Sequence, residues 1–197
     1  MSRETDAHNW LYKGRCYKLS HDVPHPGGVI PNALITAREF DPQKLIPHLF
    51  SETDPGFHTR VKPGDIIVTG RNFGMGPKMN GYIAMQALGL GLVCESMPFL
   101  AYRAAVGVGL PVMTDCFNVT ELCDTGDELE IDFRSGMFFN HTRDIRKEYP
   151  PLPEALRHHH RQHDPALPGG QVRARSRHRH GADLIDSGGG ERPGQVP

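Results

Sequence analysis

Apolar positions in this 197-residue chain follow strand and helix periods in turn. The run Ile66–Val68 is short and β-branched, which is typical of a strand covered on both faces. Tyr82–Leu88 is apolar almost all round and predicts a buried helix that stops at Gly89. By the same patterns we expect extended segments at Trp10–Leu19, Val29–Ala37, Leu90–Glu95, Leu110–Thr114, Glu128–Phe133 and Met137–His141, and helices at Asp41–Phe50 and Pro98–Gly107.

Turn signals separate these elements. His21–Gly28 is rich in Pro and Gly and predicts a loop, and Ser135-Gly136 joins the last two strands in a hairpin. The helix that begins at Asp41 is capped by that residue and broken near Pro47. Alternating strands and helices followed by a hairpin indicate an α/β domain with a mixed sheet. Its candidate core residues include Leu11, Tyr17 and Leu19 in the first strand and Phe99, Tyr102 and Val106 on one helix face.

Composition divides the chain into a flexible N-terminus at residues 1–9, one domain at residues 10–150 and a low-complexity tail at residues 151–197. The tail gathers His, Arg, Gly and Pro and cannot bury enough apolar surface to offset its chain entropy, so we expect disorder. A metal-binding or nucleic-acid-binding arm is the alternative, although the interspersed acids and missing aromatics disfavour nucleic acid. The abrupt change after Arg157 also fits a GC-rich gene read in the wrong frame, which resequencing the DNA there would test.

Charge and hydropathy exclude several classes of protein. The formal net charge is -1 and the pI is about 6.9, so nothing global indicates a nucleic-acid or anionic-membrane partner. No apolar run is long enough to span a bilayer, and the polar segment Met1–Asn9 does not resemble a signal peptide. We therefore expect a cytoplasmic protein.

The four cysteines, Cys16, Cys94, Cys116 and Cys123, are widely spaced. They form no Cys-x-x-Cys pair and no cysteine–histidine pairing of the kind that binds metals. Cys94 lies in an apolar run and is predicted to be a small buried residue. We expect no zinc ion and no iron–sulfur cluster to be held by this chain alone.

The glycine-rich turn after Ile66–Val68 is the strongest candidate for chemistry. Gly70, Gly74 and Gly76 permit backbone conformations that side chains forbid, and a helix opens at about Asn80. Backbone N–H groups at such a turn, together with a helix N-terminus, suit a carboxylate or a phosphate. The alternative is a tight strand-to-helix connection without a ligand. A phosphate-binding motif would need Ser or Thr after Lys78, where this chain has Met79.

Several ordered motifs resemble one family. Val61–Gly76 is similar to the segment "KPGDIIVAGxNFGxG" of isopropylmalate dehydratase small subunits, the detached swivelling domain of the aconitase superfamily. The resemblance covers about Trp10 to Leu156 and implies a three-layer α/β fold with a mixed sheet. Its other matching segments are Val29–Pro31, Ala87–Leu90, Glu95-Ser96, Tyr102-Arg103, Gly107–Pro111 and Gly126–Asp132.

The resemblance also implies a function. In such enzymes a large partner subunit carries a 4Fe-4S cluster whose open iron binds the substrate's hydroxyl and one carboxylate. The small subunit closes over it with a "GSSRE" loop that supplies a serine base and a carboxylate-binding arginine. The reaction is reversible dehydration of a small anionic hydroxy di- or tricarboxylate, as in leucine biosynthesis. The resemblance thus accounts for the missing cluster cysteines.

The sequence departs from the family where the chemistry should lie. After Gly76 it reads Pro77-Lys78-Met79-Asn80-Gly81, without the serines or the arginine, and His25-Pro26-Gly27 replaces the family's "DTD". Lys78 is therefore the candidate catalytic residue, either as a carboxylate contact or as a base. The alternative is a catalytically silent swivel domain that only binds a large subunit. The candidate substrate-binding residues are Arg71, Asn72, Gly74, Met75, Gly76 and Pro77.

Three side chains near this loop have plainer interpretations. Arg103 is expected to pair with an acid such as Glu95. His21 and His25 belong to a loop that faces the cleft in the family, and a lone loop histidine is usually solvated. Lys78 itself has the alternative of a solvated surface lysine.

Overall fold

The computed structural model describes residues 10–76 and 78–151, and the predictions for residues 1–9, Pro77 and residues 152–197 lie outside these ranges. Within them the chain forms one seven-stranded sheet in the order β4-β3-β2-β1-β5-β6-β7. The strands are β1 Leu11–Lys18, β2 Ile66–Thr69, β3 Gly91–Cys94, β4 Val112–Met113, β5 Glu128–Asp132, β6 Met137–Asn140 and β7 Ile145–Glu148. The helices are α1 Asn32–Thr36, α2 Pro42–Leu45, α3 Asn80–Ala87 and α4 Phe99–Gly107.

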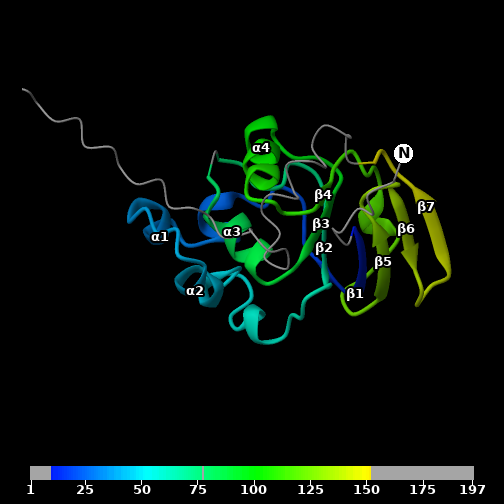
Figure 1. Cartoon of the computed structure of the whole chain (residues 1–197), viewed down its shortest axis with the longest axis horizontal. Coiled ribbons are helices and arrows are strands. Elements are labelled where there is room, and N and C mark those ends of the chain that lie inside the picture. Colours follow the sequence, from blue (N-terminus) through cyan, green and yellow to red (C-terminus); the bar gives the residue numbers. More distant parts are fainter. Residues whose placement is uncertain (1–9, 77, 152–197) are drawn as a thin grey trace, which may run out of the picture.

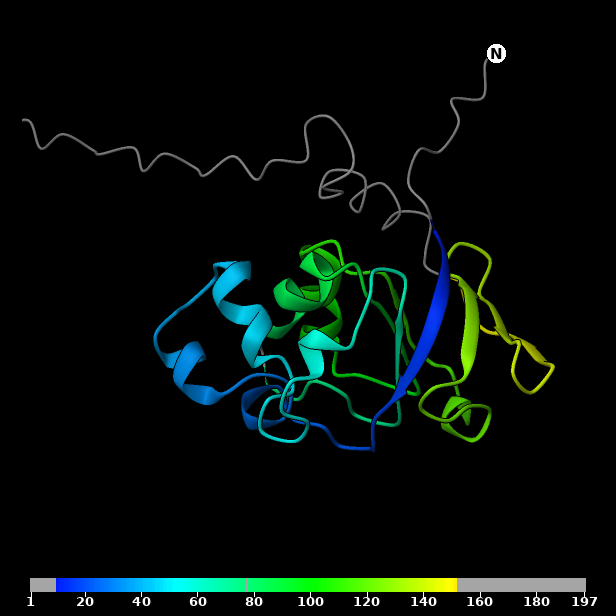
Figure 2. The ribbon, with the colours of Figure 1, turned by 90° about the horizontal axis from the view of Figure 1, so that it is seen from below.

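The sheet is mixed, as the sequence predicted. Strands β1 to β4 run parallel, with Cys16 opposite Ile66 and Ile66 opposite Gly91. Strands β5, β6 and β7 continue the sheet in antiparallel pairs from β1. Helices α1 to α4 lie on one side of the parallel strands, and β5 to β7 extend on the other (Figures 1 and 2). The carboxyl ends of β1 to β4 therefore share one edge, where ligands of such sheets usually bind.

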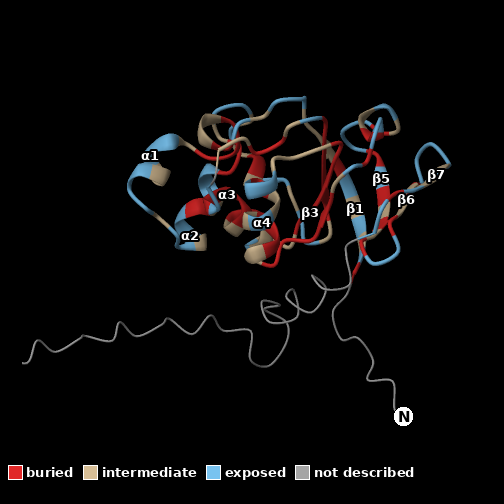
Figure 3. Cartoon of the chain, turned by 90° about the horizontal axis from the view of Figure 1, so that it is seen from above, coloured by how far each residue is buried: buried red, intermediate tan, exposed pale blue. Residues whose placement is uncertain are grey.

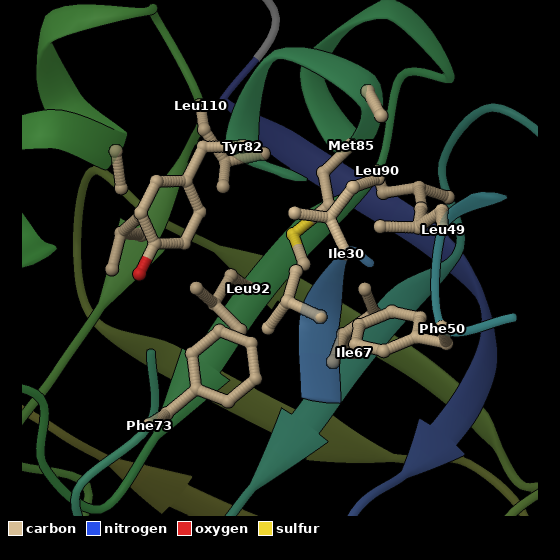
Figure 4. Packing of buried hydrophobic residues seen from close by; sticks show 14 of the residues in the cluster. Ile30, Leu49, Phe50, Ile67, Phe73, Tyr82, Met85, Leu90, Leu92 and Leu110 are labelled. Atoms are coloured by element: carbon tan, nitrogen blue, oxygen red, sulfur yellow. The ribbon is translucent and has the colours of Figure 1, made fainter. Parts of the chain in front are cut away.

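Side chains of the parallel strands point alternately into two hydrophobic cores. Ile67 packs with the helices, whereas Ile66 and Val68 face the opposite core. The buried residues follow α3 and the inner strands (Figure 3), and the helix-side core holds large side chains such as Tyr82 and Phe73 (Figure 4). The prediction that Ile66–Val68 is a strand covered on both faces is confirmed.

The predicted extended segment Val29–Ala37 is wrong beyond Pro31. Val29 and Ile30 are buried, but the chain then turns into the short helix α1 at Asn32. Pro31 precedes the helix, and a proline's fixed backbone angle suits that entry. No residue of α1 is fully buried, so its apolar side chains show neither a clear helical period nor a clear strand period.

Two core predictions are also wrong, for positional reasons. Leu11 is 36% exposed because β1 begins there, and Trp10 before it is buried instead. Phe99 is 70% exposed at the first turn of α4, which buries Ala101, Ala105 and Val106. The predicted helix Asp41–Phe50 is confirmed in parts, as α2 with Asp41 accepting from Gln43 N–H and then a 3-10 turn at Ile46–His48.

The remaining helical turns are short. The segment His25–Val29 is closed by a hydrogen bond from Ile30 N–H to His25 O, but Pro26 and Gly27 have non-helical backbone angles, so the predicted loop at His21–Gly28 is confirmed. Two 3-10 turns lie at Phe57–Thr59 and Val119–Glu121. Among the residues that the structure describes, no helix combines the length and the apolar character that crossing a bilayer requires.

A buried carboxylate joins the turn before β2 to strand β1. Asp65 is 4% exposed, and its two oxygens accept the backbone N–H groups of Arg15 and Lys62, each at 2.8 Å. We expect Asp65→Ala to lower the free energy of unfolding by about 3 kcal/mol, because both donors lose a charged acceptor. Urea denaturation measures this, with Asp65→Asn as the control that keeps the volume. An unchanged unfolding midpoint for Asp65→Ala would contradict it.

Candidate functional site

The glycine loop, defined as residues 70–76 and 78, follows β2 at the carboxyl edge of the parallel strands. Four consecutive backbone N–H groups of this loop already have acceptors inside the protein. Arg71 donates to His21 Nδ1, Asn72 to Ser96 Oγ, Phe73 to Ser96 O and Gly74 to Val23 O, at 2.8 to 3.0 Å. These four amides therefore do not face a ligand, which leaves any recognition of an anion here to side chains and to the other N–H groups of the loop.

Asn72 fastens the loop to the segment that follows β1. Its backbone lies in the left-handed region, with φ 61°, which Asn tolerates better than most residues. Its Nδ2 donates to Asp22 Oδ1 at 3.0 Å and to Met75 Sδ at 2.8 Å. The Asp22 N–H in turn donates to Arg71 O at 2.8 Å. The predicted substrate-binding residue Asn72 thus has a role within the loop, whereas the Arg71 side chain is exposed.

Gly74 cannot be replaced without a collision. It has φ 76°, and a Cβ built there would lie 1.9 Å from the Tyr82 hydroxyl. That hydroxyl is buried and has no hydrogen-bond partner in the described segments. Burial raises the pKa of Tyr82, so the hydroxyl stays protonated. Gly76, the third predicted glycine, also has a positive φ of 103°.

His25 is fully buried, so the prediction of a solvated loop histidine is wrong. Its ring packs edge-on against Tyr82, with centroids 4.7 Å apart, and its Nε2 accepts the N–H of Gly81 at 3.1 Å. Burial and, to a smaller extent, the charge of Lys78 together lower the pKa of His25 to about 4. The imidazole is therefore neutral at physiological pH and belongs to the support beneath the loop.

A groove of about 360 Å³ lies beside the loop. Lys78 and Arg38 both line it, and neither forms an ion pair with an acid in residues 10–76 or 78–151. Asn80 is fixed nearby by a hydrogen bond from its Nδ2 to Glu39 O at 2.5 Å. The rest of the lining is apolar and comprises Ile35, Phe40, Met79 and Ala104. Two unpaired cations beside apolar walls suit a small anion that carries an alkyl group.

The structure brings together some of the predicted site residues and separates others. Lys78 is exposed in the groove, whereas Gly74 is a buried residue of the loop and Met75 is half-buried. Met75 pairs with Pro24 in an isolated bridge, and Pro77 lies outside the described residues. Sequence reasoning missed Arg38, because a single arginine after a short apolar run carries no local signal of a site.

Arg103 does not make its predicted pair with Glu95. Its guanidinium lies over the Phe99 ring, 5.6 Å from the centroid, which is a cation–π contact. The carboxylate of Glu95 instead accepts a hydrogen bond from Thr120 Oγ1 at 2.9 Å.

All four cysteines are free and buried, which confirms the prediction for Cys94. Burial is the main reason that the pKa of Cys94 rises to about 12. Over the described ranges, with their gap at position 77, no group of three or more His, Cys, Asp or Glu side chains is arranged to hold a metal ion.

The known proteins that this chain resembles in sequence are small subunits of one kind of enzyme. The chain is 34% identical to 3-isopropylmalate dehydratase small subunit 2 of Archaeoglobus fulgidus over 145 residues, which cover 73% of this chain and 85% of that protein. It is 36% identical to the 3-isopropylmalate dehydratase small subunit of Thermodesulfovibrio yellowstonii over 149 residues, covering 72% and 83%. The chain belongs to the 3-isopropylmalate dehydratase small-subunit family.

Membership in this family extends to the three-dimensional structure. The crystal structure of 3-isopropylmalate dehydratase from Methanocaldococcus jannaschii has a TM-score of 0.67 and 29% sequence identity, covering 75% of this chain and 86% of that one. The isopropylmalate/citramalate isomerase small subunit of the same organism is 34% identical over 152 residues. No protein-family model matches the chain. The mixed-sheet α/β fold implied by the swivelling-domain resemblance is confirmed.

Proposed function

We propose that this chain is the small subunit of a hydro-lyase that reversibly dehydrates a hydroxy di- or tricarboxylate of the 3-isopropylmalate type. The observation that carries the proposal is the groove next to the glycine loop, in which Lys78 and Arg38 lie beside apolar walls without an acid partner among the residues that the structure describes. Family membership supports it, since the relatives are small subunits of dehydratases and isomerases. Leucine biosynthesis in the cytoplasm is the setting that the proposal implies.

Lys78 is the residue that meets the reacting part of the substrate. As a point charge it holds a carboxylate without the planar fork of the arginine that the family uses. Arg38 offers a second cation on the opposite lining segment, which matches a dicarboxylate. Ile35, Phe40 and Met79 receive the alkyl substituent and exclude water from the contact.

The proposal assigns the metal to an aconitase-type large subunit. Its 4Fe-4S cluster would supply the Lewis acid that polarises the substrate's hydroxyl. This chain's own part is to bind the carboxylates, to hold Lys78 at the groove and to shield the reacting groups when the two subunits close. No nucleic acid or membrane takes part.

Lys78→Ala is expected to lower kcat/KM of the reconstituted complex at least about tenfold, because a charge-assisted contact is worth about 1.5–3 kcal/mol. Anaerobic assays with a reconstituted cluster measure this. Lys62→Ala is the matched control, since Lys62 is an exposed lysine in the turn at the other end of β2. Wild-type kinetics for Lys78→Ala would remove Lys78 from the site.

A second candidate function is a catalytically silent swivel domain that retains partner binding. It is favoured by the loop itself, which lacks the family's serines and arginine and uses the amides of residues 71–74 internally. Complex formation does not separate the two functions, because both bury the same interface. Activity of the complex on isopropylmalate, citramalate, dimethylmalate and homocitrate does, and silence on all four favours the second function.

A further inference from the structure

His25 has no part in the reaction just described, yet it is a polar side chain that is fully buried next to the loop. It is 0% exposed and reaches the N-terminus of α3 from the segment before α1. Burying an imidazole costs desolvation free energy, which its hydrogen bonds must offset. The contacts of His25 show which parts of the chain its hydrogen bonds join.

Two hydrogen bonds from this one residue hold both flanks of the segment that carries Lys78. The His25 backbone N–H donates to Met75 O at 2.8 Å, before Lys78 in the chain. The His25 Nε2 accepts from Gly81 N–H at 3.1 Å, after it. Gly81 is close enough for this bond because it lacks a side chain, since a Cβ there would lie 2.3 Å from Val29 Cγ1 and 3.3 Å from the imidazole.

The acceptor role determines the tautomer of the ring. Nε2 offers its lone pair to Gly81, so the neutral imidazole carries its proton on Nδ1. Nδ1 is buried and has no hydrogen-bond partner in the part of the chain that the structure describes. The groups that face the ring are Tyr82, through its aromatic edge, and Lys78, through its charge. A cation on the ring would meet that charge and lose the Gly81 bond.

We propose that His25 is a positioning residue that, as the neutral Nδ1–H tautomer, ties Met75 and the N-terminus of α3 together and thereby places Lys78 at the groove. Its effect on turnover rests on the proposed function, but the tie itself does not. Because small displacements of a contact group cost up to about a hundredfold in rate, loss of the tie should affect catalysis although His25 touches no substrate.

The tie is tested on the full chain alone. Long-range ¹H–¹⁵N NMR of the imidazole should show the Nδ1–H tautomer at pH 7, and the Gly81 amide should exchange slowly with solvent. In His25→Phe, which keeps a ring but has no acceptor, we expect Gly81 exchange to quicken at least about tenfold. An Nε2–H tautomer, a charged ring at pH 7, or equal exchange in both proteins would overturn the proposal.

Its effect on the reaction is tested in the complex. His25→Phe should lower kcat/KM about tenfold, and His25→Gln, whose amide oxygen can accept from Gly81, should recover at least half of that loss on a logarithmic scale. His58→Phe is the control, because His58 also has a buried, unpartnered Nδ1 but lies at the turn Phe57–Thr59. Wild-type kinetics for His25→Phe would overturn the positioning role. A wild-type complex without activity would instead refute the proposed function and leave the NMR result to decide the tie.

Discussion

Gly74→Ala is expected to lower the free energy of unfolding by about 3–4 kcal/mol. Two costs combine at this position. An alanine must adopt φ 76°, which strains its backbone, and its Cβ would lie 1.9 Å from the Tyr82 hydroxyl oxygen, which must therefore move. Neither neighbour yields easily, because Tyr82 is packed in the helix-side core and Gly74 is held by its N–H bond to Val23 O. Chemical denaturation followed by circular dichroism measures the loss.

The two costs can be separated with matched variants. Gly126→Ala carries strain alone, since Gly126 has φ 99° but nothing within 4 Å of a Cβ, and should lose only about 1–2 kcal/mol. Tyr82→Phe removes a buried hydroxyl that has no partner in the described residues and should be neutral or stabilising. In the double variant with Gly74→Ala, most of the steric part should disappear. Equal losses for Gly74→Ala and Gly126→Ala would show that the collision is not real.

The second large effect is on stability in acid. The protein is expected to lose about 3 kcal/mol of unfolding free energy as pH falls from about 6.5 to about 4, because the pKa of His25 is lowered from 6.5 to about 4 by burial. The folded state keeps the ring neutral while the unfolded chain takes up a proton below pH 6.5. Stability is therefore complete above pH 6.5, and the loss levels off below pH 4.

His25→Gln is the variant that isolates this effect, because glutamine has no proton to take up in the window. Its unfolding free energy should fall by about 3 kcal/mol less than that of the wild type between pH 6.5 and 4. Carboxylates such as Asp124 and Glu130, whose pKa ion pairs lower, also cost stability as pH approaches 4, because the unfolded chain takes up their protons first. These carboxylates are present in both proteins, so their contribution cancels in the difference. Parallel pH profiles for the two proteins would contradict the buried neutral state of His25.

These predictions share a physical basis in how the glycine loop is built. The backbone amides of residues 71–74, which a loop of this kind could offer to an anion, are here engaged by His21, Ser96 and Val23. These amides consequently tie the loop to its neighbours, and in the proposed function the charge for recognition comes from Lys78 and Arg38 at its margin. That arrangement fits the resemblance described above, in which the scaffold motifs are kept while the serines and the arginine of the family's loop are missing.

Sequence reasoning located the elements whose patterns are local. The buried strand at Ile66–Val68 and the stop of α3 at Gly89, with φ 68°, depend on neighbouring residues and on a conformation that glycine favours. It failed at α1, where none of the five residues is fully buried and two partly buried side chains leave no period to detect. It also placed Phe99 in the core, where the structure does not have it. Helical spacing shows which residues share a face of the helix, but it does not show which face packs against the sheet.

What the sequence by itself determined is most of the strands and helices, though not α1 or β7, together with the family and the position of a glycine turn that ends at Lys78. These follow from periodicity, backbone preferences and motifs, which act over a few residues. Only the tertiary structure decided that His25 is buried beneath the loop, that Arg38 joins Lys78 in one groove, and that the amides of residues 71–74 are already engaged. Those contacts join residues between 23 and 56 positions apart in the chain, and such pairs are set by how the sheet folds against its helices rather than by any local pattern.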